Sequence, residues 1–528
     1  MSNRLAEIAE ESTRGGFSLF LGNASATFIS AIVVVIIARL LGPDNYGIYA
    51  LCFTISYLAV AVTNLGLSPA LTRYSARMTS EGREPELATM LRSVFISSLL
   101  LAVLALIVVL LFSDELAAYG LRRPGIGEYL RLASFLIVFQ VVFTATSSAL
   151  IGLGRMADAS FMMTIQSVAK AVASPTLVLL GLGVAGAILG HITGFIVAAS
   201  LGVILLFAKH YRKLSIESKG SSMGYVESLR VAVKYGLPLY FGGLLTTLLI
   251  QYQNLVLAHN VPDFEIGNFN AAVNFSALLS LVAYPITTAL FPAFSKIDTH
   301  SESSDLNKMF QISVKYGSFL LIPASMIVAF LSKDLVSTIY GPSYGSAPLY
   351  LSIYVGISLL VGFGSVILGP LFNGIGETKV TLKITIVTAA LFLVVAPVMA
   401  QAYQVVGLIV AFIVSNLAGT AYGLNMAHKK FNLKLDLNSS LRIYLASGIS
   451  IVPTLILLSA ANLPSLLNIA IGGFTYLASY LTFAPLIGAI KRTDVENLSQ
   501  ILGKIKILNQ IIKPIIVYEN RMLSALKP

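Results

Sequence analysis

The side chain best placed for chemistry in this sequence is a lysine inside an apolar stretch. Lys170 lies near the centre of 161–182, which is long enough to cross a bilayer. An ammonium group there costs roughly 2.5–3.5 kcal/mol on insertion scales, so by default it indicates a functional site. The structural alternatives are a lysine that a partner neutralises or one that reaches an interface. As a functional group it would bind an anion such as a phosphate, as a point charge.

Other polar side chains recur three or four residues apart in apolar segments, which places them on single helix faces. Each such stripe alone is more typical of hydrogen bonding between helices. Because four predicted helices carry one, the sequence also predicts a polar substrate cavity. Its candidate lining residues are Lys170, Gln166, Asn23, Thr27, Gln251, Asn254, Asn270 and Asn274.

Four charged residues near the predicted helix ends have possible roles at the mouths of this cavity. Arg39 and Asp44 flank the Gly-Pro pair at 42–43, and we expect them to form an ion pair at the outer mouth. A structural pair is favoured, and a gate that breaks during transport is the alternative. Arg73 and Lys315 lie near cytoplasmic ends, where they could receive a head group from the inner leaflet.

Acidic side chains are missing from the depth of every apolar segment. A proton-driven antiporter usually needs an intramembrane carboxylate. With Lys170 present, the charges therefore favour an anionic substrate over a cationic drug. An inside-negative potential favours outward movement of a negative charge by about 2.3 kcal/mol per 100 mV, so we expect the membrane potential to assist.

The elements that carry these residues are membrane-spanning helices. The chain has 528 residues, of which 56% are hydrophobic and 11% charged, and its mean hydropathy is +0.84. This composition predicts an all-α polytopic membrane protein. Fourteen apolar segments are long enough to span, near residues 16–40, 46–66, 90–112, 132–152, 161–182, 184–208, 232–257, 267–290, 316–332, 349–372, 384–402, 404–427, 443–461 and 466–488.

The basic residues predict the orientation. With a cytoplasmic N-terminus, five of the 35 Lys and Arg residues fall in external segments and one is Lys170, which leaves 29 on the cytoplasmic side. This asymmetry is the positive-inside pattern. It explains the net charge of +11 by an anionic leaflet without nucleic acid. We expect a multi-pass protein of the plasma membrane with both termini in the cytoplasm.

Internal repetition divides the chain into two similar lobes. At a shift of 220 residues Gly47 falls on Gly267, and at 222 Pro175 falls on Pro397. Six helices separate the copies, so both have the same orientation, which is typical of a parallel transporter repeat. The predicted domains are a six-helix lobe (1–208), a cytoplasmic linker (209–231), a second six-helix lobe (232–430), helices 13 and 14 (431–490) and a cytoplasmic amphipathic tail (491–528).

Four stretches of the sequence are ARLLGPDNYGIYAL (Ala38–Leu51), GLSPALTRYSA (Gly66–Ala76), the segment Asn268–Ile297 and NGIGETKVTLKI (Asn373–Ile384). Together they resemble polysaccharide flippases of the Wzx type, in the multidrug/oligosaccharidyl-lipid/polysaccharide exporter superfamily. The resemblance covers roughly residues 12–430. It implies a flippase that moves a lipid-linked sugar from the cytoplasmic to the outer leaflet.

One position departs from that family. Relatives often carry an aspartate in helix 7, where this chain has Gln251, Gln253 and Asn254. The change argues against carboxylate-based cation coupling at this position.

The resulting reading is a transporter and not an enzyme, with no cofactor and no metal site. It would translocate a polyprenyl- or dolichyl-(di)phosphate-linked oligosaccharide by alternating access, for cell-surface glycan synthesis. Its expected partners are that substrate, membrane lipids and glycan-synthesis enzymes, and we expect a monomer. The alternatives are a multidrug cation antiporter of the same superfamily and a membrane-embedded glycan polymerase or transferase.

Overall fold

The structure is a computed structural model that describes residues 2–211, 223–297, 303–461, 463–496, 518, 519, 522 and 524. Within these residues every regular element is a helix and none is a strand. The predicted all-helical class is therefore confirmed. Residues 212–222 of the predicted linker (209–231) and most of the amphipathic tail (491–528) lie outside the described residues.

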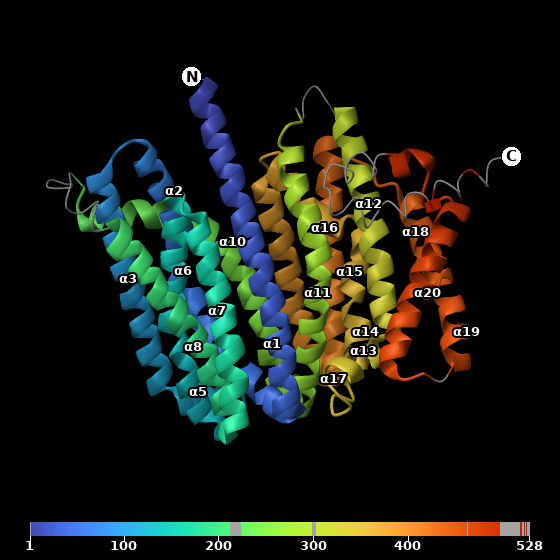
Figure 1. The fold of residues 1–528 in the computed structure, drawn as a ribbon, viewed down its shortest axis with the longest axis horizontal. Helices are drawn as coiled ribbons and strands as arrows, with labels where there is room; N and C mark the ends of the chain where they lie inside the picture. The colour runs from blue at the N-terminus through green and yellow to red at the C-terminus, as the bar shows by residue number, and fades with distance from the viewer. Residues whose placement is uncertain are drawn as a thin grey trace. The chain divides into compact units, whose positions relative to one another are not determined.

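The chain forms two compact units, and Figure 1 labels their helices. Unit 1 comprises residues 1–271 and 396–408, and unit 2 comprises 272–395 and 409–528. The helices of unit 1 are α1 (Ser2–Asn64), α2 (Leu67–Ser80), α3 (Glu84–Leu111), α4 (Ser113–Glu115), η1 (Leu116–Gly120), η2 (Pro124–Ile126), α5 (Gly127–Ser134), α6 (Leu136–Gly152), α7 (Met156–Leu177), η3 (Val178–Leu182), α8 (Gly183–Val203), η4 (Ile204–Tyr211) and α10 (Tyr225–Asn260).

The helices of unit 2 are α12 (Ser303–Phe330), α13 (Ser332–Ile339), α14 (Ala347–Tyr354), α15 (Gly356–Leu359), η5 (Leu360–Phe363), α16 (Ser365–Gly374), α18 (Leu437–Ile449), α19 (Ile451–Ala461) and α20 (Ser465–Leu486). Two helices, α11 (Asp263–Phe294) and α17 (Thr378–Phe431), have residues in both units. These contact-based units differ in definition from the two predicted six-helix lobes, so the lobe boundaries remain a prediction from the sequence repeat.

Long continuous helices contain breaks where the sequence predicts turns. In α1 the backbone of Gly42 leaves the helical region with φ 71° and ψ 169°. In η3 Gly181 has φ 90°, and in α17 Gln404 has φ 52°. A positive φ is readily adopted by glycine and does not belong to a continuing helix. The helices α1 and α17 therefore each hold two successive apolar segments, and Gly181 separates the segment of α7 from that of α8.

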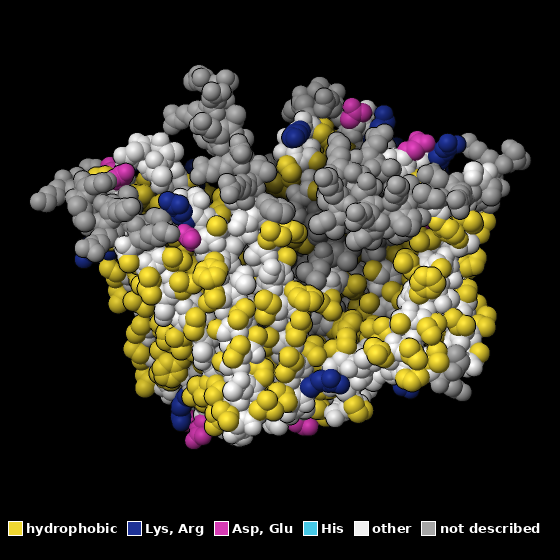
Figure 2. Space-filling model, viewed as in Figure 1, with side chains coloured by type: hydrophobic (Ala, Val, Ile, Leu, Met, Phe, Trp, Pro, Cys, Tyr) yellow, Lys and Arg dark blue, Asp and Glu magenta, His cyan; other side chains and the backbone are white. Residues whose placement is uncertain are grey.

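Nine helices of the described residues are long and apolar enough to cross a membrane, or ten with the bent pair Ala347–Phe363 and Ser365–Gly374. On the face drawn in Figure 2, hydrophobic side chains cover the flanks of the helices, and charged ones gather near their ends. Exposed apolar flanks between charged ends fit a bilayer and not water. The chain is therefore a multi-pass membrane protein.

Each unit has its own apolar packing. In unit 1 a core cluster joins α2, α3, α6, α7 and α10 through residues such as Leu71, Leu91 and Leu150. In unit 2 one cluster joins α12, α16 and α17, and another joins α12, α18 and α20. These clusters hold the helices that carry the polar residues described next.

Candidate functional site

A cavity of about 510 Å³ opens in unit 1 between the second half of α1, the start of α2, α6 and α10. Its size lies within the range of roughly 300–1,000 Å³ that small-molecule sites have. The lining residues are Tyr57, Val60, Ala61, Asn64, Gly66, Pro69, Gln140, Thr144, Leu239, Tyr240, Gly243, Leu244, Thr247 and Gln251.

The polar groups of this cavity are amides and hydroxyls, and no lining side chain is charged. The Oε1 atom of Gln140 is buried and accepts no hydrogen bond from the described residues. The Tyr240 hydroxyl donates to the Val62 carbonyl over 3.2 Å. A buried amide oxygen without a donor is costly unless a ligand or water supplies one. The lining therefore suits an uncharged ligand with many hydroxyl groups.

Of the predicted substrate residues, Gln251 lines this cavity. Asn254, one turn further along α10, donates to the Thr54 hydroxyl over 3.1 Å. Asn270 of α11 donates to the Asn254 side-chain oxygen over 3.1 Å. The structure thus brings Asn254 and Asn270 together as a hydrogen-bonded link between three helices.

Lys170 lies outside the cavity, in the packed interior of unit 1. Its side chain is only 6% exposed, and no ion pair of the described residues includes it. A Cβ atom at Gly194 would lie 3.1 Å from the Lys170 Cβ, and one at Gly190 would lie 2.2 Å from the Ser174 Cα. The two glycines therefore let α8 pack directly on the face of α7 that carries Lys170.

His191 of α8 connects this interior to the cavity. The Tyr49 hydroxyl lies 2.9 Å from its Nδ1 atom, and the Tyr57 hydroxyl lies 3.2 Å from its Nε2 atom. Both ring nitrogens thus have a tyrosine partner, although the direction of each bond depends on the tautomer. Since Tyr57 also lines the cavity, a polar chain runs from the cavity wall into the core.

The remaining stripe residues have different surroundings. Gln166 accepts a hydrogen bond from the Ser167 hydroxyl over 3.2 Å, and Ser167 also shares one with Ser30 of α1 over 3.1 Å. The side chains of Asn23 and Thr27 are exposed. Asn274 is half-buried, in the part of α11 that belongs to unit 2. Their predicted contacts with substrate stay predictions.

The side chains of Arg39 and Asp44 are both exposed. Between them the backbone of Gly42 leaves the helical region with a φ of 71°. Their predicted ion pair and the alternative of a gate stay predictions.

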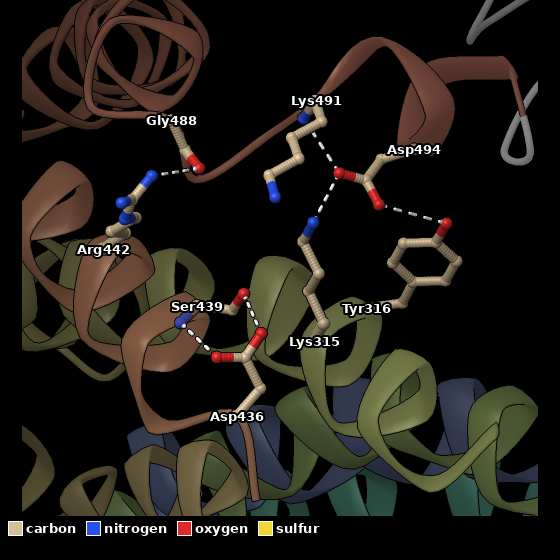
Figure 3. Close-up of polar contacts among 8 residues, drawn as sticks. All are labelled: Lys315, Tyr316, Asp436, Ser439, Arg442, Gly488, Lys491 and Asp494. Atoms are coloured by element: carbon tan, nitrogen blue, oxygen red, sulfur yellow. Dashed lines mark hydrogen bonds and ion pairs between the residues drawn. The ribbon is translucent and has the colours of Figure 1, made fainter. Parts of the chain in front are cut away.

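The two residues predicted to receive a head group, Arg73 and Lys315, both contact other side chains of the protein. The Arg73 guanidinium lies 4.1 Å from the centre of the Tyr235 ring, a cation–π contact between α2 and α10. The Lys315 Nζ atom lies 2.5 Å from the Asp494 Oδ2 atom (Figure 3). Asp494 also accepts from the Lys491 backbone over 2.8 Å and from Tyr316 over 3.4 Å.

Sequence reasoning missed Gln140, Tyr57 and an ion pair between Arg123 and Asp263. Gln140 could have been found, because it is the amide inside the apolar stretch 132–152. The pair joins residues 140 positions apart over 2.7 Å, and no local pattern predicts it. Among the described residues, no group of three His, Cys, Asp or Glu could hold a metal ion.

Family models match most of the chain. One described as "Polysaccharide biosynthesis protein" matches residues 12–298, and one described as "Lipid II flippase MurJ" matches residues 241–481. A relative from Haloferax volcanii, "Probable low-salt glycan biosynthesis flippase Agl15", is 21% identical over 93% of this chain and 99% of its own. The "Putative O-antigen transporter" of Shigella dysenteriae is 21% identical, over 75% and 94%.

Solved structures agree with the fold. The inward closed conformation of the lipid II flippase MurJ has a TM-score of 0.70 at 17% identity, over 88% of this chain and 98% of that one. An inward-facing MATE-family multidrug transporter has a TM-score of 0.66 at 19% identity, over 77% and 94%. At these identities the likeness concerns the fold alone.

Proposed function

Because the chain belongs to the polysaccharide biosynthesis protein family, we propose that it is a flippase for a lipid-linked oligosaccharide. It is a transporter and not an enzyme. The observation that carries this proposal is the cavity of about 510 Å³, whose polar lining is entirely amide and hydroxyl. Sugars present hydroxyl groups that both donate and accept, and the amide side chains that line the cavity, such as Gln140 and Gln251, can bond hydroxyls in both ways.

The lipid-linked glycan would enter with its sugars in the cavity while the polyprenyl or dolichyl tail stays in the bilayer. Lys170, as the buried cation of the same unit, would attract the phosphate or diphosphate of the carrier. The hydrogen-bonded chain of Tyr49, His191 and Tyr57 runs from the cavity wall, where the sugars would bind, into the core of the unit that also holds Lys170. An inside-negative membrane potential would assist outward movement of the phosphate charge.

Finer features of the proposal follow from the sequence. If each broken helix counts as two spans, and α11 and the bent pair as one each, the chain has fourteen spans in two six-helix lobes plus two. The basic residues favour a plasma-membrane protein with both termini in the cytoplasm. We expect it to act as a monomer beside the enzymes that build the glycan.

The test is flipping in reconstituted vesicles. The probe is a polyprenyl-diphosphate-linked neutral oligosaccharide with a fluorescent label, which an impermeant reagent modifies only in the outer leaflet. We expect Gln140→Leu and Gln251→Leu to slow modification of the inner pool at least tenfold. Gln401→Leu, at an exposed glutamine of α17, is the matched control. Equal rates for all three variants and wild type would refute a sugar site in this cavity.

A multidrug cation antiporter is the second candidate, because MATE-family transporters share the fold. The apolar segments lack the deep carboxylate that binding of a cation would use. Vesicles that accumulate a lipophilic fluorescent cation under a proton gradient, but do not flip the labelled glycan, would favour this candidate.

A further inference from the structure

The corner between α10 and α11 is bound by two neighbouring arginines: Arg122 donates to the His259 carbonyl over 3.4 Å, and Arg123 makes most of the contacts. α10 ends at Asn260 and α11 begins at Asp263. The carbonyl of Ala258 would bond the N–H of residue 262 in a continued helix, but that residue is Pro262. Arg123, between η1 and η2, donates from Nη1 to this carbonyl over 3.1 Å. The arginine thus supplies the donor that the proline lacks.

The rest of the guanidinium binds the same corner. Its Nη2 atom donates to the Val261 carbonyl over 2.6 Å, and its Nε atom lies 2.7 Å from the Asp263 carboxylate. The two side chains are 20% and 22% exposed. A cation at a helix C-terminus also meets the negative end of the helix dipole. Such charge-assisted bonds are about twice as strong as neutral ones.

A pair of glycines brings the two backbones together beside this arginine. A Cβ atom at Gly47 would lie 2.1 Å from the carbonyl oxygen of Asp263, and one at Gly267 would lie 1.9 Å from that of Pro43. Small residues permit this close approach between helices. Gly47 and Gly267 are 220 residues apart, and so are Pro43 and Asp263, which is the repeat shift. The two repeats therefore contact each other reciprocally, with equivalent residues in exchanged roles.

These contacts join the first repeat to the first two helices of the second, at the end predicted to be external. Alternating access requires the repeats to separate there when the site opens outward. We propose that Arg123 is a positioning residue of the transport cycle, which holds the α10–α11 corner on the first repeat and releases it on outward opening. The contacts at Gly47 and Gly267 set the distance between the backbones in the closed state. The hydrogen bonds and ion pair of Arg123, here called the latch, stabilise that state.

The role of the latch in transport rests on the proposed function. Its effect on conformation does not, because that effect is measured as a distance without any transport assay. Spin labels at Tyr119→Cys and His259→Cys, both exposed positions, report the distance between the Arg123 segment and the corner. The buried Cys52 is first replaced by Ala. Wild type in lipid nanodiscs is expected to populate mainly the short distance.

Arg123→Gln is expected to raise the ratio of long to short distances at least about tenfold. The reason is that a hydrogen bond to a charged group stabilises the closed state by enough to change its population by more than that factor. Arg123→Lys, which keeps the charge and loses the planar fork, should give an intermediate ratio. Arg131→Gln is the matched control, since Arg131 pairs with Asp114 and not with the corner. Gly267→Ala should also raise the ratio, by pushing the backbones apart without loss of charge.

Distances in Arg123→Gln and Arg123→Lys that match wild type and Arg131→Gln would overturn the latch, whatever the flipping rate. If Arg123→Gln does not fold, as thermal unfolding would reveal, Arg123→Lys and Gly267→Ala decide the question alone. A raised ratio with no flipping by any variant or wild type would leave the latch in place and reject the proposed function instead.

Discussion

Removal of Lys315 separates a structural role from a role in substrate binding. The Lys315–Asp494 pair joins α12 to the segment that follows α20, and its side chains are 14% and 12% exposed (Figure 3). Breaking such a buried pair by deleting one partner costs about 3–5 kcal/mol, because a charge is left unpaired. Asp494 keeps its bonds from the Lys491 backbone and Tyr316. We therefore expect the lower end, about 3 kcal/mol, for Lys315→Met.

Lys308→Met is the matched control on the same helix. Lys308 lies 3.8 Å from Asp305, and both side chains are mostly exposed, at 72% and 65%. Exposed pairs contribute up to about 1 kcal/mol. The double variant Lys315→Met, Asp494→Leu should recover most of the loss, because apolar replacement of a buried pair is often neutral. The measurement is the free energy of unfolding of purified protein in detergent, with flipping measured in parallel.

The refuting result is a Lys315→Met variant that is as stable as Lys308→Met and no longer flips the labelled glycan. Lys315 would then serve the substrate, as the sequence predicts for a residue that receives the head group. If stability falls by about 3 kcal/mol and flipping at low temperature persists, the pair fastens the C-terminal segment onto α12.

Three further predictions concern single groups. Lys170→Met should abolish flipping without loss of stability, because it removes a buried charge at similar volume; a stability loss that parallels the transport loss would make Lys170 structural. Burial acts to raise the pKa of Asp436, but the two hydrogen bonds from Ser439 and the charges of Lys315 and Lys491 together outweigh it and hold this pKa below its usual value. Asp436→Ala should therefore cost about 1 kcal/mol in unfolding free energy at neutral pH, and progressively less as the pH falls below about 3.9; a pH-independent cost would contradict this. Burial raises the pKa of Glu519 to about 7, so the buried state of this side chain should lose stability as the pH rises from about 4.3 through 7, and Glu519→Gln should remove this pH dependence in hydrogen exchange at Tyr518 and at position 519.

Local sequence determines the positions of helix breaks well. The turn at 181–183 was predictable because two glycines interrupt an apolar run that is too long for one span, and Gly181 does have a positive φ. The class of the fold followed from composition in the same way, since a chain with so little charge must hide its backbone polar groups in helices. These inferences use spacing along one segment and need no tertiary contact.

Partners across helices could not be predicted. Asp494 lies 179 residues from Lys315, and Asp263 lies 140 residues from Arg123, so no spacing rule relates them. Arg39 and Asp44 lie only five residues apart on either side of the backbone break at Gly42, and both are exposed, so their spacing alone does not decide whether they pair. Helical spacing predicts which side chains share a face, and the packing of helices decides what that face meets.

The position of Lys170 can be compared with its counterpart in the second repeat. At the shift of 222 residues its counterpart is Phe392, which is fully buried in unit 2 and packs edge-on against Phe412 at 5.3 Å. Both repeats therefore bury this position, and in the second copy an aromatic ring fills it. In the first copy the same buried position holds a cation that no described residue pairs with, at a cost that an apolar side chain would avoid. Because packing at this position is satisfied by an apolar residue, the charge of Lys170 is best explained by the substrate, and Lys170→Met tests that explanation directly.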